Sequence, residues 1–339
     1  MKERDLFFDN LKYILIFLVV LGHFGEAYMG HGIIRGITIV IYSFHMPLFI
    51  FVSGYFSKNI TSAKIQDLNV LLLYLTFQVY HFLYTRATGL GLAYSLSFLY
   101  PVHANWYLLA LFVWRLAAPY FRFFKKGSAL IVVLILVLLT GFSREFNETP
   151  LYRIFFFLPF FLLGFYCNDL KALMNKYRNY RLLFVIVFFL GEASLFVIAQ
   201  YKQPGYALWN AFVPYYGYIG FGNLTYGFIA RTAGICCSLI LAWCFLFMVP
   251  GHRTFYSDAG KNTLYVYVFH MFIVWAVALL PYRYLLTELL CIVSSFCIAY
   301  ILSSTVAVNM LKRLIINIPG KPARSKSEQQ DAMVTEDES

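Results

Sequence analysis

The sequence predicts an all-α fold: a polytopic integral membrane helix bundle of about ten transmembrane helices, with N- and C-termini cytoplasmic. Three observations carry this prediction. Of the 339 residues, 61% are hydrophobic and 13% are charged, which is more apolar surface than a soluble domain of this size can bury. Apolar runs of spanning length recur along the whole chain. Most basic residues fall in the loops on one side of these runs.

A window of about 19 residues identifies ten apolar ranges that we expect to be spans. In chain order they are 9–29, 34–56, 66–85, 104–124, 128–142, 152–168, 182–200, 224–249, 262–280 and 285–308. Residues 201–223 are also apolar, and we interpret them as an outer loop or a re-entrant segment. We expect residues 1–318 to form one membrane-embedded domain. The polar, turn-rich residues 319–339 have the composition of a disordered cytoplasmic tail.

The loop charges give the orientation. With the N-terminus inside, 18 of the 27 lysines and arginines lie on the inner side and six on the outer side. This asymmetry is also the reason to exclude an eleventh span at 201–223, which would move the C-terminal cations outside. The net charge of +11 does not indicate nucleic-acid binding, because no basic run carries interleaved aromatic residues. The six cysteines lie in apolar segments without metal-ligand spacing, so we expect no metal site.

The first apolar range carries a polar stripe. His23 follows Lys12 by eleven residues, about three helical turns, so both side chains leave one face of the helix. Asp9 precedes Lys12 by three residues and Glu26 follows His23 by three, which places them near the same face. Ionisable groups at membrane depth are costly and by default mark a functional site.

Depth along the predicted spans groups the histidines. His23, His45 and His270 fall in the central part of their spans, whereas the remaining four lie near the membrane surfaces (His31, His81, His103 and His252). Glu192 and Arg231 match in depth on adjacent spans, and we interpret them as a structural ion pair.

The chemistry of the stripe suggests two tasks. Imidazole is the side chain best suited to take a proton from a hydroxyl near neutral pH, so His23 is a candidate general base oriented by Glu26. Lys12, about 16 Å below His23, is placed to bind a phosphate of a long donor that enters from the cytoplasm. The alternative for Lys12 is a lysine whose stem packs on apolar surface while its amine reaches water.

Several motifs resemble those of the membrane acyltransferase family 3, in particular its fucose 4-O-acetylase-like sugar O-acetyltransferases. Lys12 and His23 match the family's basic-x10-His signature. Four further blocks follow in the expected order and start at Ser43-Phe-His45-Met-Pro, Asn105-Trp106-Tyr-Leu-Leu, Arg153-Ile-Phe-Phe-Phe-Leu-Pro and Gly260-Lys261-Asn262-Thr-Leu. Together the blocks cover residues from about 5 to 310.

The resemblance implies an enzyme, an acyl-CoA-dependent O-acyltransferase in a bacterial plasma (inner) membrane. Its co-substrate would be cytoplasmic acetyl-CoA, with no bound cofactor, and its acceptor a sugar hydroxyl of a surface polysaccharide or its precursor. His23 and Glu26 are the candidate catalytic residues. Trp106 and Arg153 are the candidate acceptor contacts. The candidate donor contacts are Lys12, Asp9, His45, Lys261, Asn262 and His270.

Two other functions fit some of these features. A glycan or small-molecule transporter or flippase would also carry intramembrane charges and aromatic loops, although no repeated halves are visible. A sensor or scaffold would use the basic inner surface alone. The sequence leaves open the acceptor, the acyl length, direct transfer against an acyl-histidine intermediate, and the oligomeric state.

Overall fold

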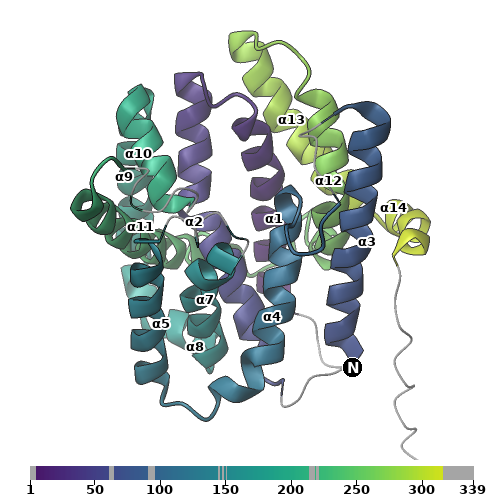
Figure 1. Ribbon diagram of the computed structural model, residues 1–339. Helices are drawn as coiled ribbons and strands as arrows, with labels where there is room; N and C mark the ends of the chain where they lie inside the picture. The colour runs from purple at the N-terminus through teal and green to yellow at the C-terminus, as the bar shows by residue number, and fades with distance from the viewer. Residues whose placement is uncertain are drawn as a thin grey trace, which may run out of the picture.

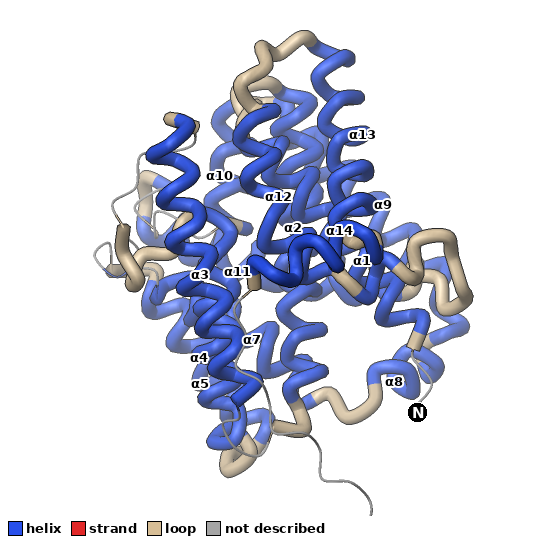
Figure 2. Tube along the Cα trace, turned by 90° about the vertical axis from the view of Figure 1, so that its right-hand side faces the viewer, coloured by secondary structure: helices blue, strands red, loops and turns tan. Residues whose placement is uncertain are grey.

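A computed structural model describes residues 5–60, 65–90, 96–143, 146, 149, 151–213, 218 and 221–315. Within these ranges the chain forms helices and loops, and no strand occurs (Figure 2). The predicted all-α class is therefore confirmed for this part of the chain. The tail expected at 319–339 lies outside the described residues.

Each of the ten predicted ranges contains a helix. In chain order the helices of eight residues or more are α1 (Leu6–Glu26), α2 (Gly32–Ser57), α3 (Ile65–Thr88), α4 (Trp106–Phe121), α5 (Lys126–Thr140), α7 (Leu151–Tyr166), α9 (Arg181–Gln200), α10 (Lys202–Phe212), α11 (Leu224–Leu246), α12 (Thr263–Val277) and α13 (Tyr284–Leu302). Two shorter helices follow bends, α8 (Leu170–Lys176) and α14 (Thr305–Leu311). Short 3-10 turns are η1 (His103–Asn105), η2 (Arg178–Tyr180), η4 (Ala259–Lys261) and η5 (Lys312–Leu314). The segment 201–223, expected as a loop or re-entrant piece, begins with α10.

Four of the described helices are long and apolar enough to cross a membrane: α1, α2, α9 with the preceding turn, and α11. The number rises to six if the bent pairs 151–176 and 286–314 each count as one span. The chain is thus a multi-pass membrane protein. The count of ten spans and the side on which the termini lie stay predictions.

Helices α1 and α2 stand at the centre of the bundle (Figure 1). Helix α2 packs on α7, α9 and α11, whereas α1 packs on α2, α12 and α13. Two apolar cores result. One joins α1 to α3, α4, α7 and α12, and the other joins α1 and α2 to α9 and α11. Helices α1 and α2 are therefore packed against several other helices, and this packing restricts the side chains that they carry.

Local signals set the start of α1. The Asp5 carboxylate caps the helix by accepting a hydrogen bond of 3.1 Å from the backbone N–H of Phe7, one of the first donors that an α-helix leaves without a partner. At the other end, the turn at residues 27–31 separates α1 from α2. The last turn of α1, which carries His23 and Glu26, thus lies beside the first turns of α2.

Two glycines allow α2 and α7 to approach backbone to backbone. A Cβ atom on Gly54 would overlap the carbonyl oxygen of Phe161, and one on Gly164 would overlap the carbonyl oxygen of Phe51. Neither obstacle is a flexible side chain, so a substitution has to separate the two helices. Small residues at helix crossings of this kind are common in membranes, where close packing drives helix association.

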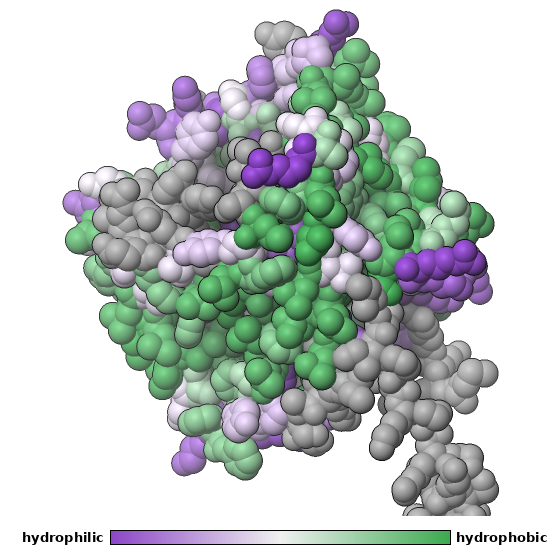
Figure 3. Space-filling view, turned by 45° about the vertical axis from the view of Figure 1, so that its right-hand side comes forward, coloured by the Kyte–Doolittle hydropathy of each residue, from purple (hydrophilic) through white to green (hydrophobic). Residues whose placement is uncertain are grey.

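Apolar side chains also cover much of the outside. Figure 3 shows one face on which hydrophobic residues form a broad area. Exposed large residues of α5 and α9 contribute to the apolar exterior, among them Ile131, Leu139, Leu182 and Leu190. Lipid-facing side chains account for such a surface, because a soluble protein rarely exposes so much contiguous apolar area.

We expect Gly54→Ala to destabilise the protein by about 1–3 kcal/mol, because the added methyl group meets backbone that cannot rotate away. Thermal unfolding of the purified protein in detergent measures the change. Gly127→Ala is the matched control, since a Cβ there meets nothing within 4 Å. Equal melting temperatures of the two variants would contradict the close α2–α7 contact.

Candidate active site

The last turn of α1 holds a histidine–carboxylate pair. His23 Nδ1 lies 3.3 Å from Glu26 Oε2, one helical turn further along, as the spacing predicted. A carboxylate accepts hydrogen bonds only, so Nδ1 carries the hydrogen, and in the neutral ring Nε2 keeps its lone pair. The pair therefore presents an imidazole nitrogen able to accept a proton.

Tyr42 of α2 completes the pair, and sequence reasoning missed it. Its hydroxyl donates a hydrogen bond to Glu26 Oε1, so the two oxygens of one carboxylate bind His23 and Tyr42. Gly22 makes this contact sterically possible, because a Cβ at that position would lie 2.7 Å from the Tyr42 ring. A tyrosine in an apolar helix carries no marker in the sequence, and only the rotation of α2 against α1 turns it toward Glu26.

His270 of α12 lies next to this group. Its ring centroid is 5.3 Å from that of His23, and the residue is fully buried. His270 Nδ1 lies 2.8 Å from the carbonyl oxygen of Tyr267, to which it donates, so Nε2 is left as an acceptor. That atom is buried and has no hydrogen-bond partner among the described residues. The structure thus brings together two imidazoles that lie 247 positions apart in the chain.

His45 is held one turn along α2 from Tyr42. Its ring packs edge-on against Tyr42, with centroids 4.7 Å apart, and its Nδ1 lies 2.7 Å from the carbonyl oxygen of Ile41. His45 is therefore in the cluster, and the Tyr42 ring contacts both His45 and His23. Among the described residues, no three His, Cys, Asp or Glu side chains are arranged to hold a metal ion.

Trp106 and Arg153 meet near this end of the bundle. The Arg153 guanidinium lies 5.6 Å from the centre of the Trp106 ring, which also stacks on Phe157 at 5.1 Å. Arg153 is close enough for its charge to act on the hydroxyls of Tyr42 and Tyr267. These two sequence candidates therefore belong to the same region as His23, on the starts of α4 and α7.

His103 is also a neighbour of the candidate active site, although its depth along the predicted spans placed it near a membrane surface. Its backbone has φ of 42°, in the left-handed region that costs a residue with a side chain about 1–3 kcal/mol. Its ring packs edge-on against Trp275 at 5.0 Å, and it interacts electrostatically with Glu26. Strain of this kind persists where surrounding packing imposes it, and it often accompanies a functional site.

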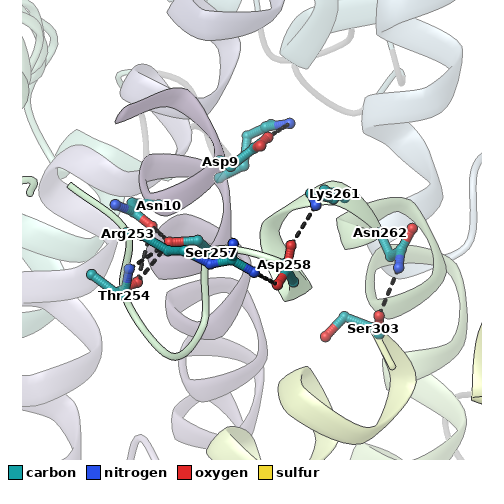
Figure 4. A network of polar contacts seen from close by, with 10 residues as sticks. Asp9, Asn10, Arg253, Thr254, Ser257, Asp258, Lys261, Asn262 and Ser303 are labelled. Carbon is teal, nitrogen blue, oxygen red and sulfur yellow. Dashed lines mark hydrogen bonds and ion pairs between the residues drawn. The ribbon is translucent and has the colours of Figure 1, made fainter. Parts of the chain in front are cut away.

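The other end of α1 holds a set of paired charges (Figure 4). Lys12 Nζ lies 2.9 Å from the buried carboxylate of Asp9. Lys261 and Arg253 both bind Asp258, the latter at 2.7 Å. Hydrogen bonds from Lys261 and Arg253 lower the pKa of the Asp258 carboxyl below its ordinary value, so these ion pairs are present at neutral pH and are lost only in acid. Both lysines that we expect to bind the donor therefore already have a carboxylate partner.

Asn10 fixes the loop that carries these charges. Its side-chain amide donates to the carbonyl oxygens of Pro250 and His252 at 2.8 and 2.9 Å. Its oxygen accepts from Ser257 and Thr254 at 2.6 and 3.0 Å (Figure 4). The Asn10 side chain is fully buried, whereas three of its four hydrogen bonds reach partners that are only partly buried. The loop between α11 and η4 is thereby tied to the first turns of α1.

Asn262 makes a similar link between helices. Its amide donates a hydrogen bond of 2.8 Å to the carbonyl oxygen of Ser303, where α13 has just ended. One of its donors therefore holds the end of α13 and is not directed at the polar stripe. Sequence spacing did not indicate this structural use.

The expected ion pair between Glu192 and Arg231 is wrong. Glu192 accepts a hydrogen bond of 2.9 Å from Ser43 of α2. Arg231 is fully buried among aromatic rings instead, 4.7 Å from the centre of Tyr218 and 5.2 Å from that of Tyr152. Equal depth on adjacent helices does not determine which way each side chain points, and here the two point to different neighbours.

Comparison with known proteins identifies the family. The family model described as an acyltransferase domain matches residues 5–304, nearly the whole chain. The chain belongs to this acyltransferase family. The resemblance to the membrane acyltransferase family 3 is thereby confirmed.

One curated relative is similar over part of its length. It is the nodulation protein NolL of Sinorhizobium fredii (strain NBRC 101917 / NGR234), 28% identical over 185 residues. The aligned region covers 48% of this chain and 49% of the relative, so the two are comparable over about half of each protein. No solved structure matches this chain significantly.

We expect Asn10→Ala to release the loop at 250–258, because it removes four hydrogen bonds made by one buried side chain, each worth about 1 kcal/mol net. Hydrogen exchange read by mass spectrometry should show faster exchange in peptides from this loop. Asn309→Ala, at an exposed position of α14, is the control. Unchanged loop exchange in Asn10→Ala would show that other contacts hold the loop.

Proposed function

We propose that this membrane acyltransferase moves an acetyl group from acetyl-CoA to a hydroxyl of a sugar, in a surface polysaccharide or its precursor. The observation that carries the proposal is the arrangement of His23, Glu26 and Tyr42. It provides a base whose tautomer and orientation are both set by hydrogen bonds. The localisation proposed is a bacterial inner membrane, with ten spans and both termini in the cytoplasm.

The chemistry follows from this arrangement. His23 Nε2 takes the proton of the acceptor hydroxyl while its oxygen attacks the thioester carbonyl of the donor. The tetrahedral intermediate collapses, the carbon–sulfur bond breaks, and the imidazolium returns the proton to the leaving thiolate. Glu26 stabilises the positive charge that His23 carries between these two steps, and Tyr42 keeps the carboxylate in place. General-base assistance of this kind contributes about 10²–10⁴-fold.

The donor would enter at the end of the bundle where α1 starts. Its phosphates would replace the carboxylates that pair with Lys12 and Lys261 in this structure. Asp9, Asn262 and His45 would lie along the path of the donor. Lys12 and His23 are about 16 Å apart along α1, a separation that a long, flexible thioester donor can bridge. His270, with an acceptor nitrogen beside His23, is placed to contact the thioester end.

The acceptor would approach from the opposite end of α1. Trp106 offers an aromatic face, and Arg153, stacked on it, offers hydrogen-bond donors to sugar hydroxyls. Transport of a glycan without chemistry is the alternative. Membership of an acyltransferase family does not favour it.

We expect His23→Ala to lower O-acetylation by at least about 10²-fold while the protein still folds and inserts. Glu26→Gln should retain an intermediate activity, because the ring keeps its position but loses the stabilising charge. Proton NMR of surface polysaccharide measures the acetyl content in a gene-deleted strain complemented with each variant. His31→Ala is the control, since that exposed ring stacks on Tyr282, away from Glu26 and Tyr42.

Normal acetylation by His23→Ala would refute the assignment of the base. Unchanged acetyl content in every strain, the deletion included, would exclude the surface glycan as acceptor. Glycan transport by the purified protein with no release of CoA would then support the transporter.

We expect Lys12→Ala to weaken the binding of acetyl-CoA by about tenfold, roughly 1.4 kcal/mol, whereas Lys12→Arg retains binding. Equilibrium binding to the purified protein measures this effect. Lys202→Ala, which removes an exposed cation at the start of α10, is the matched control. Equal affinities of Lys12→Ala and wild type would place the donor phosphates elsewhere.

A further inference from the structure

A cavity of about 310 Å³ lies where the start of α1 meets η2, α9 and the end of α11. Its floor is apolar and includes Phe7, Leu246 and Met248. Two arginines also line it, Arg178 from η2 and Arg181 from the first position of α9. The combination of an apolar floor and cationic groups suits a ligand with a charged head and apolar chains.

The charge of this cavity is uncompensated. No aspartate or glutamate lines it, and neither arginine takes part in an ion pair within the described part of the chain. Arg181 Nε donates a hydrogen bond of 3.0 Å to the carbonyl oxygen of Phe247. That bond orients the guanidinium and leaves its two terminal nitrogens available. Two guanidinium groups that line one cavity favour a phosphate, which an arginine fork binds through two parallel hydrogen bonds.

The surface beside the cavity is that of a lipid boundary. Leu182 and Leu183 follow Arg181 directly and are 72% and 52% exposed. Helix α9 continues as a candidate membrane span with most of its residues exposed. The two guanidinium groups therefore lie at the level where lipid-facing side chains begin, which is the level of phospholipid headgroups.

The cavity is separate from the candidate active site. Phe7 and His23 are sixteen positions apart, which places them roughly 160° apart around α1 and about 24 Å along it. The loop tied to Asn10 also forms one wall of the cavity, through Pro250 and His252. A donor seated here would have α1 between its thioester and His23, so the cavity does not serve acyl transfer.

We propose that this cavity binds the headgroup phosphate of an anionic phospholipid, held by Arg178 and Arg181, with the acyl chains along the exposed face of α9. The site would tie this end of the bundle to the leaflet that surrounds it. The inference rests on the cavity alone and does not depend on the proposed reaction.

Native mass spectrometry of the full-length protein, released from detergent with phosphatidylglycerol or phosphatidylcholine, tests the proposal. We expect wild type to retain phosphatidylglycerol in preference to phosphatidylcholine. Arg178→Gln with Arg181→Gln should lower the retained phosphatidylglycerol about tenfold. Arg122→Gln with Lys125→Gln removes the same charge from the α4–α5 turn, away from the cavity, and should retain the lipid as wild type does.

A single variant and a competition experiment distinguish lipid binding from misfolding and from binding of a soluble phosphate. Arg178→Gln alone leaves the bond between Arg181 and Phe247 intact, so a partial loss in that variant excludes misfolding as the cause. Inorganic phosphate and pyrophosphate, added in separate titrations, should compete only weakly. Equal retention of the two lipids, equal loss in the control variant, or preference for the soluble phosphates over phosphatidylglycerol would each overturn the proposal.

Discussion

Every ionisable group on α1 has to be satisfied inside an apolar bundle, and the arrangement of the neighbouring elements depends on that requirement. An unpaired charge at this depth costs several kcal/mol, so each ionisable side chain of α1 needs a polar or charged partner nearby. Asp9 and Lys12 pair within the helix. Asn10 binds the loop before η4, and Glu26 binds both His23 and Tyr42. The loop and α2 are thus attached to α1 by polar contacts as well as by packing.

This requirement also separates two chemical environments along one helix. At the start of α1, cations and carboxylates are paired close to the polar end of the bundle. At its other end, imidazole, carboxylate and phenol groups gather between α1, α2 and α12. The two environments are joined by one rigid element of known rise, so their separation of about 16 Å is constant. A reaction between a donor that binds at one end and an acceptor that approaches from the other needs such a fixed separation.

Close packing at three glycines sets the spacing between the central helices and their neighbours. Gly54 and Gly164 let α2 and α7 meet backbone to backbone, and Gly22 lets the Tyr42 ring lie against α1. Each glycine removes a side chain where a hydrogen-bonded partner or a neighbouring carbonyl needs the space. The position of Tyr42 relative to Glu26 therefore follows from the same small residues that set the spacing of the helices. Membrane proteins rely on such contacts, because lipid provides little hydrophobic drive between helices.

The helices and the face of α1 that carries the polar stripe could be predicted from the sequence alone. Apolar runs of spanning length have no alternative to helix in a membrane, since every backbone group needs an internal partner. The contact between His23 and Glu26 was predictable from their three-residue spacing, because the helical period sets which residues of one helix are neighbours. Tyr42 was found only in the tertiary structure. His270 was a candidate from the sequence, but its contact with His23 was likewise decided by packing. Glu192 and Arg231 failed as a pair because depth is encoded along a helix, whereas the direction of a side chain around its axis is decided by packing against other helices.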